Sequence, residues 1–180
     1  MHERRYNGEI ERLRAPQRVE LLEVDHVVDL CLKGVKAMNV LDVGTGSGIF
    51  SEAFSKRGMN VTGIDPNPEM LKSAQEFVPT GTFLDGTIEQ MPSKDKSFDL
   101  VFLGHVLHES DNISKALSES KRVAKQKICV LEWPYKEEES GPPLEHRLKI
   151  EEILAAAKQV GFSSVEKIQL HHMVFFRFAV

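Results

Sequence analysis

The residues from 40 to 50 combine a carboxylate with alternating glycines, a pattern typical of a loop that holds a nucleotide-like ligand. Residues 40–43 have the composition of a buried strand, and a helical pattern follows over residues 47–57. Glycine permits positive φ and lets a ligand approach the main chain closely. Thr45 and Ser47 are of the types that cap helices, so we expect them to cap the helix that follows. The glycines of this loop are Gly44, Gly46 and Gly48.

Asp42 stands two residues before the first glycine and indicates which ligand the loop binds. A dinucleotide-binding loop directs a helix N-terminus at a pyrophosphate, which a carboxylate at Asp42 would repel. The glycine spacing differs too, because Ile49 occupies the place of the third glycine of the dinucleotide motif. We therefore expect Asp42 to suit a ligand with an amino group, and both features disfavour a nicotinamide-dependent oxidoreductase.

A second carboxylate, Asp65, ends the next predicted strand, over residues 60–64. Strand, helix and strand follow one another within about 25 residues, as in a βαβ unit, which predicts parallel strands and a right-handed crossover. At the tip of the second strand, an acid faces the crevice where a ribose would lie. An aspartate at a strand end also serves as a turn or cap residue, so its role depends on the surrounding motif.

Together these segments resemble the first two motifs of class I S-adenosylmethionine-dependent methyltransferases, and in particular the type 11 group that includes ubiquinone and menaquinone biosynthesis enzymes. Residues 63–71, which contain Asp65, match the second motif. The resemblance implies that S-adenosylmethionine is the cofactor and that Asp65 binds its ribose. Asp85 would then bind the adenine amine. The other contacts implied by the resemblance come from Asp42, the glycine loop 44–48, Pro66, Met70, Gly86, Thr87 and Gly104. Met70 reads equally well as a core methionine.

His105 and His108 follow the predicted central strand, residues 97–104, and are the imidazoles nearest to the expected methyl group. Methyl transfer from a sulfonium is an in-line displacement, so the protein mainly positions the acceptor and excludes water. A base is needed only where the acceptor carries a proton of high pKa. We name both histidines as catalytic candidates, as bases or orienting donors, with a structural hydrogen-bonded role as the alternative.

Two motifs of related enzymes are missing near these histidines. The Asn/Asp-Pro-Pro-Tyr/Phe motif of enzymes that methylate exocyclic amines of bases is absent, and so is a Pro-Cys nucleophile. The residues present around His105 and His108 resemble those of methyltransferases that act on small molecules. A protein or RNA acceptor stays open, as does a methyltransferase-like binding module that works through a partner.

The order of the elements predicts one α/β domain over residues 1–180. We expect a three-layer α/β/α, Rossmann-like, mostly parallel sheet of seven strands that ends in an antiparallel C-terminal hairpin. The further expected helices cover residues 19–32, 112–124 and 150–160, and the further expected strands cover residues 83–84, 128–131, 165–170 and 173–179.

Two flanking segments have a different character. Residues 1–18 are rich in arginine and read as a solvated helical arm. In the resembling family such an arm often forms a lid, which makes Tyr6 and the arginines of the arm weak contact candidates. Residues 132–148 contain Trp133 and Tyr135 and follow a strand of the open sheet, so they are our candidate substrate loop.

The composition is that of an ordinary globular protein, with 41% hydrophobic and 28% charged residues. A net charge of -4 disfavours a nucleic-acid partner. The start has no apolar segment of a signal peptide, so we expect a cytoplasmic protein without a membrane partner. Cys31 and Cys129 read as core residues, and no metal site is expected. We allow for a homodimer.

Overall fold

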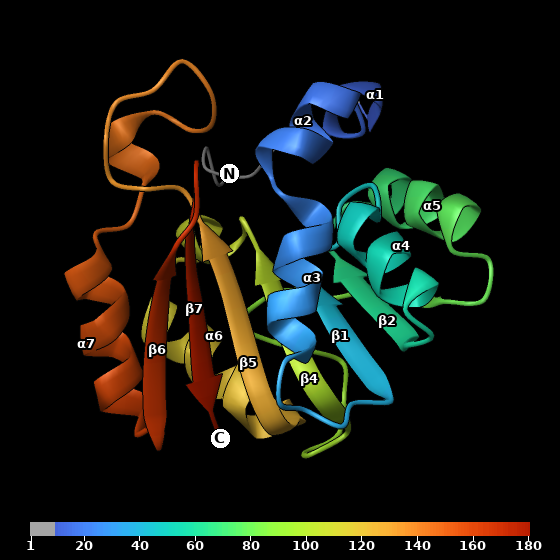
Figure 1. Ribbon diagram of the computed structural model, residues 1–180. Helices are drawn as coiled ribbons and strands as arrows, with labels where there is room; N and C mark the ends of the chain where they lie inside the picture. The colour runs from blue at the N-terminus through green and yellow to red at the C-terminus, as the bar shows by residue number, and fades with distance from the viewer. Residues whose placement is uncertain (1–9) are drawn as a thin grey trace.

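A seven-stranded sheet forms the centre of the computed structural model, which describes residues 10–180 (Figure 1). The strand order is β3-β2-β1-β4-β5-β7-β6. The strands are β1 (Asn39–Val43), β2 (Asn60–Asp65), β3 (Thr82–Asp85), β4 (Phe98–Gly104), β5 (Ala124–Glu132), β6 (Ser164–Gln169) and β7 (Val174–Ala179). Strands β1 to β5 pair in parallel, whereas β7 pairs antiparallel with both β5 and β6.

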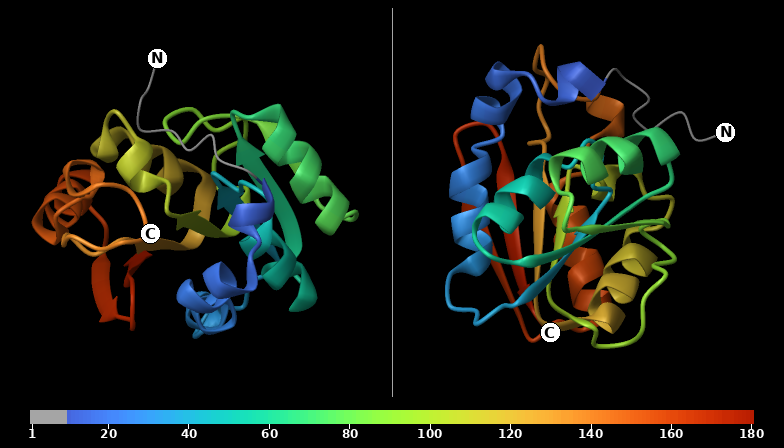
Figure 2. Two further views of the ribbon diagram at one scale, coloured as in Figure 1. Left: turned by 90° about the horizontal axis from the view of Figure 1, so that it is seen from above. Right: turned by 90° about the vertical axis from the view of Figure 1, so that its right-hand side faces the viewer.

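Helices cover both faces of this sheet, as Figure 2 shows from two further sides. Helices α3 and α4 pack together on one face, with α5 beside α4, and α6 and α7 pack together on the other. The helices are α1 (Ile10–Leu13), α2 (Pro16–Leu21), α3 (Val24–Leu32), α4 (Ile49–Lys56), α5 (Pro68–Phe77), α6 (Ile113–Val123) and α7 (Ile150–Val160), with short 3-10 turns η1 (Leu107–Glu109) and η2 (Leu144–His146). The predicted three-layer architecture with a C-terminal hairpin is confirmed.

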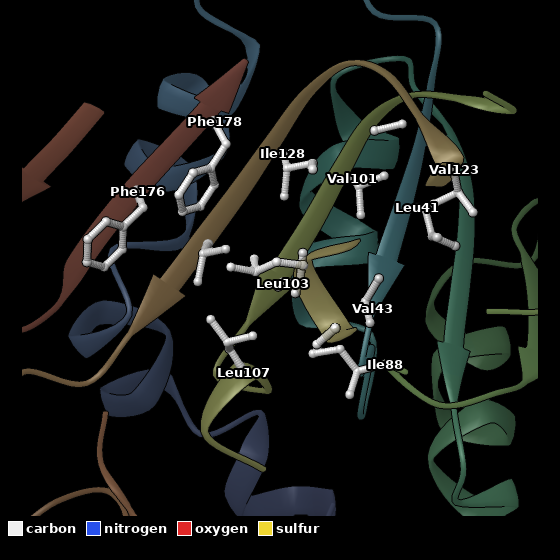
Figure 3. Packing of buried hydrophobic residues seen from close by; sticks show 14 of the residues in the cluster. Leu41, Val43, Ile88, Val101, Leu103, Leu107, Val123, Ile128, Phe176 and Phe178 are labelled. Carbon is white, nitrogen blue, oxygen red and sulfur yellow. The ribbon is translucent and has the colours of Figure 1, made fainter. Parts of the chain in front are cut away.

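The core follows from the two-residue period of the strands, because successive side chains of a strand point to opposite faces. In β4, Leu100 and Phe102 join the cluster under α3 and α4, while Val101 and Leu103 join the cluster under α6 and α7. Figure 3 shows the second cluster, with Phe176 of β7 among its members. Since β4 is buried on both faces, its uninterrupted apolar run is explained.

The order of the strands reverses beside β1, and this determines where a ligand can bind. The chain builds β1, β2 and β3 in one direction and then returns to place β4 on the other side of β1. The loops after β1 and β4 therefore leave the sheet in opposite directions and open a crevice between them. Both loops contain residues that the sequence singled out.

Two helix boundaries differ from the prediction. The expected helix 19–32 is divided into α2 and α3 at Leu22 and Glu23, and Glu23 adopts a left-handed φ of 48°. The Glu23 carboxylate accepts a hydrogen bond from the backbone N–H of His171, which ties this break to the turn between β6 and β7. The second difference concerns α4, which begins at Ile49, not at residue 47.

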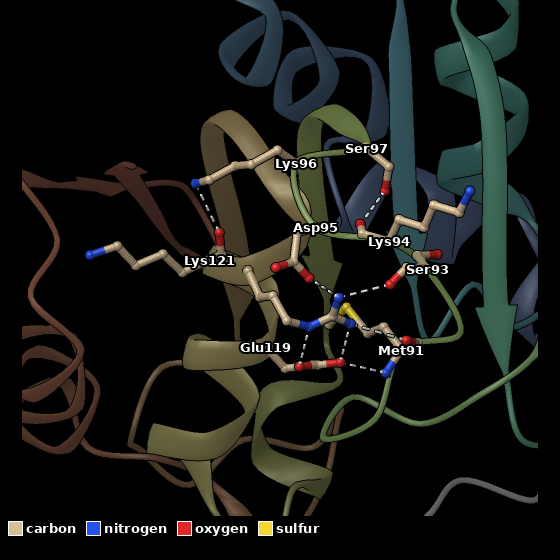
Figure 4. A network of polar contacts seen from close by, with 9 residues as sticks. Met91, Ser93, Lys94, Asp95, Lys96, Ser97, Glu119 and Lys121 are labelled. Carbon is tan, nitrogen blue, oxygen red and sulfur yellow. Dashed lines mark hydrogen bonds and ion pairs between the residues drawn. The ribbon is translucent and has the colours of Figure 1, made fainter.

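A polar network fixes the connection between β3 and β4 (Figure 4). The guanidinium of Arg122, at the end of α6, pairs with Glu119 and with Asp95 of the connection. It also donates to the backbone carbonyls of Ser93 and Met91. Glu119 in turn accepts from the backbone N–H of Met91. The segment that follows the end of β3 is thereby held to α6.

Among residues 10–180, no helix is long and apolar enough to cross a bilayer.

Phe102 offers a direct test of the core. Its ring is fully buried and lies 4.7 Å from the ring of Phe50 and 5.5 Å from that of Phe54, centroid to centroid. We expect Phe102→Ala to lower the free energy of unfolding by about 3–5 kcal/mol, because it leaves a cavity in the centre of the sheet. Urea denaturation measures this loss. Leu154→Ala on the exposed side of α7 is the control, and an equal loss in both variants would contradict the described packing.

Candidate active site

A cavity of about 770 Å³ lies at the carboxyl ends of the parallel strands. The loops after β1, β2, β3, β4 and β5 all contribute to its wall, and α1 and α2 add Arg12, Leu13 and Arg18. The sequence-predicted residues that line it are Gly44, Gly46, Asp65, Pro66, Met70, Gly86, Thr87, Gly104, His105 and His108. The predicted residues outside the lining are Asp42, Thr45, Ser47, Gly48 and Asp85.

The glycine loop approaches its neighbours closely in two places, because Gly44 and Gly48 have no side chain there. A Cβ on Gly44 would lie 2.5 Å from Val106 of the β4 loop, and a Cβ on Gly48 would lie 2.9 Å from the Cα of Ala74 in α5. Gly46 differs, because a Cβ there would meet only a backbone oxygen at 4.0 Å. Since Gly46 lines the cavity, the bare main chain forms the wall at that point.

The predicted helix caps were wrong. The residue before α4 is Gly48 itself, with φ 79°, and no side chain caps the helix. The Thr45 hydroxyl is used elsewhere, donating 2.8 Å to Asp42, and Ser47 offers its backbone carbonyl to Arg14. A glycine in the left-handed conformation replaces the side-chain cap because the loop turns sharply where α5 lies against it.

Asp42 lies behind the glycine loop, 2% exposed, and not in the cavity wall. Its Oδ2 accepts hydrogen bonds from the hydroxyls of Ser51, at 2.7 Å, and Thr45. Burial raises the pKa of Asp42 to about 6, even though these two hydrogen bonds favour the ionised form. The carboxylate therefore braces the loop against α4 from the inside.

Asp65 connects the second strand to the glycine loop. Its Oδ2 accepts the backbone N–H of Gly46 at 3.0 Å, and its Oδ1 accepts that of Asn67 at 2.9 Å. The side chain is 9% exposed and lines the cavity. One carboxylate thus fixes both the loop after β1 and the turn into α5.

The end of β3 contributes backbone more than side chain to the cavity. The Asp85 side chain is exposed and outside the lining, whereas Gly86 and Thr87 lie in the wall. Met70 is 5% exposed and lines the cavity from α5, so its core character and its position in the wall are both observed.

His105 is held in an unusual position. Its φ of 58° is in the left-handed region, and its ring lies 5.1 Å from that of Trp133. Both ring nitrogens are buried and have no hydrogen-bond partner within the described part of the chain. Burial lowers the pKa of His105 to about 3, so the imidazole is neutral near pH 7. The ring acts as a neutral part of the cavity wall.

His108 forms a pair with Glu132 of β5. Its Nδ1 lies 2.9 Å from Oε2 of Glu132, and its backbone N–H donates to Oε1 at 3.1 Å. Burial would lower the pKa of His108, but the charge and hydrogen bond of Glu132 outweigh it, and the pKa is raised. Conversely, His108 outweighs the effect of burial on Glu132 and lowers its pKa. The sequence analysis missed Glu132, although a charged residue that ends an apolar strand was the available signal.

The candidate substrate loop is organised by Arg147, which the sequence analysis also missed. Its guanidinium, with the side chain 1% exposed, donates to the backbone carbonyls of Pro134, Ser140 and Pro142 and pairs with Glu138. It lies 5.4 Å from the ring centre of Trp133. The loop residues in the cavity wall are Trp133, Gly141, Pro142, Pro143 and His146.

The described part of the N-terminal arm is fastened to the glycine loop. Arg14 donates 2.8 Å to the Ser47 carbonyl, forms an ion pair with Glu52 of α4, and stacks 3.4 Å above the ring of Phe77. This places Arg12 and Arg18 at the cavity. Tyr6, the other contact candidate of the arm, lies outside the described residues.

Other candidates lie away from the cavity. Cys31 and Cys129 are buried free thiols, as expected of core residues. Within residues 10–180, no group of three or more potential ligands could hold a metal ion.

The buried Asp42 predicts a pH dependence of stability. The pKa of Asp42 in the folded chain is about 6, above its ordinary value of 3.8, so folding disfavours the ionised form. Its unfavourable contribution is absent below the lower pKa, grows as the pH rises, and is complete above the higher one, at roughly 3 kcal/mol. Urea denaturation should show that Asp42→Asn gains stability relative to the wild type between pH 4 and pH 7. A constant difference between Asp42→Asn and the wild type would contradict this.

A family model described as "Methyltransferase domain" matches residues 41–128. The demethylmenaquinone methyltransferase of Chlorobaculum tepidum is 36% identical over 99 residues, which cover 54% of this chain and 41% of that protein. The malonyl-[acyl-carrier protein] O-methyltransferase of Pectobacterium atrosepticum is 34% identical over 88 residues, which cover 49% of this chain and 35% of that protein. The matched segments therefore span less than half of these relatives.

The solved structure of a SAM-dependent methyltransferase from Aquifex aeolicus matches along almost the entire length. The TM-score is 0.83 at 27% identity, and the alignment covers 95% of this chain and 96% of the other. The chain is therefore similar to the S-adenosylmethionine-dependent methyltransferases, in sequence over residues 41–128 and in fold over almost its whole length.

Proposed function

We propose that this chain transfers a methyl group to a small-molecule acceptor bound in the 770 Å³ cavity. The observation that carries the proposal is that one continuous cavity joins the glycine loop and Asp65 at one end to His108 and Trp133 at the other. A cofactor and an acceptor held in these two parts would share one cavity.

The chain fits S-adenosylmethionine at the first end. The bare main chain at Gly46 leaves room for the cofactor, Asp65 offers acceptor oxygens for its ribose, and Gly86 and Thr87 offer backbone groups for its adenine. Asp42 supports the glycine loop from behind, and Gly104 forms part of the wall. When bound, the cofactor supplies a methyl group on a positively charged sulfur. The contribution of the protein is orientation and exclusion of water.

A small acceptor is supported by the way in which the second end is enclosed. The N-terminal segment, through Arg12 and Leu13, and the substrate loop, through Pro142 and Pro143, both line the cavity. We propose that residues 1–18 act as a lid and residues 132–148 as the acceptor loop. The names of the two relatives specify a quinone and an acyl-carrier-bound malonyl group, so acceptors differ widely among similar chains.

We also propose a cytoplasmic location. Its support is the pair of buried free thiols, since oxidising compartments favour disulfides. The net charge of -4 supports an acceptor other than nucleic acid. Dimerisation stays a prediction.

The cofactor assignment is tested by Asp65→Ala. The substitution removes the acceptor for the ribose hydroxyls and releases the Gly46 amide, so the affinity for S-adenosylhomocysteine should fall by about 1–3 kcal/mol, or roughly 5-fold to 150-fold. Isothermal titration calorimetry measures the change. Asp29→Ala, which removes an exposed carboxylate of α3 away from the cavity, should bind like the wild type.

Unchanged affinity in Asp65→Ala would contradict the assignment of this carboxylate. If wild-type protein binds the cofactor but transfers no methyl group to any acceptor in a broad screen, the alternative of a binding module replaces the enzyme. Binding of reduced nicotinamide cofactor in its place would contradict the family's chemistry at this site.

A further inference from the structure

We propose that His108 and Glu132 form a proton-accepting dyad and that the acceptor is a weakly acidic hydroxyl on a planar ring, as in a phenol. The inference rests on the proposed function and names the acceptor class of the same cavity. Two observations support the inference: the fixed geometry of the His108–Glu132 pair, and the apolar, aromatic walls beside that pair.

The geometry of the pair selects one tautomer of the imidazole. Glu132 is 3% exposed. Its carboxylate accepts a hydrogen bond from the backbone N–H of His108 and also contacts Nδ1 of the His108 ring. The Trp133 backbone N–H also donates to Oε2, at 3.3 Å. A carboxylate held in this way keeps the proton on Nδ1 and leaves Nε2 as the ring nitrogen that can accept another. His108 lines the cavity, so Glu132 is a positioning residue and His108 is the candidate catalytic residue.

The charges around His108 favour a proton on the ring. Glu132 faces it from β5 and Glu109 adjoins it in η1, and both raise the pKa of His108, whereas Arg147 from the loop before α7 opposes them. His105 is a further titratable neighbour, and burial lowers its pKa to about 3, which keeps it neutral. A base of raised pKa is useful only if the acceptor holds a proton at working pH. A carboxylic acid has already lost its proton there, so the dyad points to a weaker acid.

The walls beside the dyad indicate a flat, apolar body for the acceptor. Trp133 follows Glu132 directly and lines the cavity with Val106, Pro142 and Pro143. The neutral ring of His105 lies against Trp133 and adds no charge to this surface. Aromatic and proline faces pack well against a planar ring, whose hydroxyl would then reach His108.

Proton transfer and methyl transfer both take place at the hydroxyl of the acceptor. The hydroxyl proton passes to Nε2 of His108, and the oxygen uses its freed electron pair to form the bond to the methyl carbon. The bond from that carbon to the cofactor's sulfur breaks, and its electron pair remains on the sulfur. The imidazolium later loses the proton to solvent, which restores the dyad.

The test compares Glu132→Gln with the wild type and with Glu145→Gln, which removes an exposed carboxylate of the same loop. Without any cofactor, NMR titration of ¹³C-labelled histidine should place the pKa of His108 above its ordinary value in the wild type and in Glu145→Gln. The pKa should be lower in Glu132→Gln. A wild-type pKa at or below the ordinary value would overturn the proposal, and this measurement needs no variant that might misfold.

Turnover is then measured with 4-nitrophenol and 4-methylphenol, at a pH at which only the first is ionised. Glu132→Gln should lose on the order of 10²-fold with 4-methylphenol and change little with 4-nitrophenol, since an ionised acceptor needs no base. The wild-type rate with 4-methylphenol should fall as the pH drops through the pKa of His108. Equal losses with both phenols, or no loss with either, would overturn the dyad.

S-adenosylhomocysteine binding separates this inference from the proposed function. If wild-type protein binds it but methylates neither phenol, the acceptor class is wrong and the proposed function stands. If wild-type protein does not bind it, the proposed function itself fails. Unchanged binding in Glu132→Gln shows that the variant remains folded around the cofactor end.

Discussion

The close approach of a bare backbone loop to three neighbours is the constraint on which the cavity depends. Gly44 lies against Val106 of the β4 loop, Gly48 lies against α5, and the N–H of Gly46 is bound by the Asp65 carboxylate. A side chain at either of the first two positions would push neighbouring elements apart. Because the loop has none there, the ends of β1, β2 and β4 meet closely enough to line one cavity.

The parallel strands place two different groups of residues on the two sides of the cavity. Their carboxyl ends face the same edge of the sheet, so the reversal of strand order at β1 places cofactor-type loops on one side and the His108–Glu132 pair on the other. Burial lowers the pKa of both histidines, but the Glu132 carboxylate reverses the shift in His108. His105, with no partner among the described residues, stays neutral, while His108 gains a carboxylate partner and favours the proton.

Much of the fold could be predicted because it rests on local patterns. The glycine loop, the strand ending in Asp65 and the helix at 150–160 all carry their signals within a few residues. Contacts between distant segments carry no such signal. Glu132 contacts His108 only because β4 and β5 are neighbours in the sheet. Arg147 donates to three backbone carbonyls of its loop only once that loop is folded. Asp42 was identified as important, but its inward orientation depends on Ser51, nine residues away in the chain.

The most direct test of the account is where the cofactor binds. Titration of ¹⁵N-labelled wild-type protein with S-adenosylhomocysteine, followed by amide NMR, reports on glycines in every part of the fold. The account predicts large shift changes for Gly44, Gly46, Gly86 and Gly104, and none for Gly34, Gly58 or Gly161, which lie outside the cavity wall. Absent shifts, or shifts confined to the second group, would contradict the assignment of this cavity as the cofactor site.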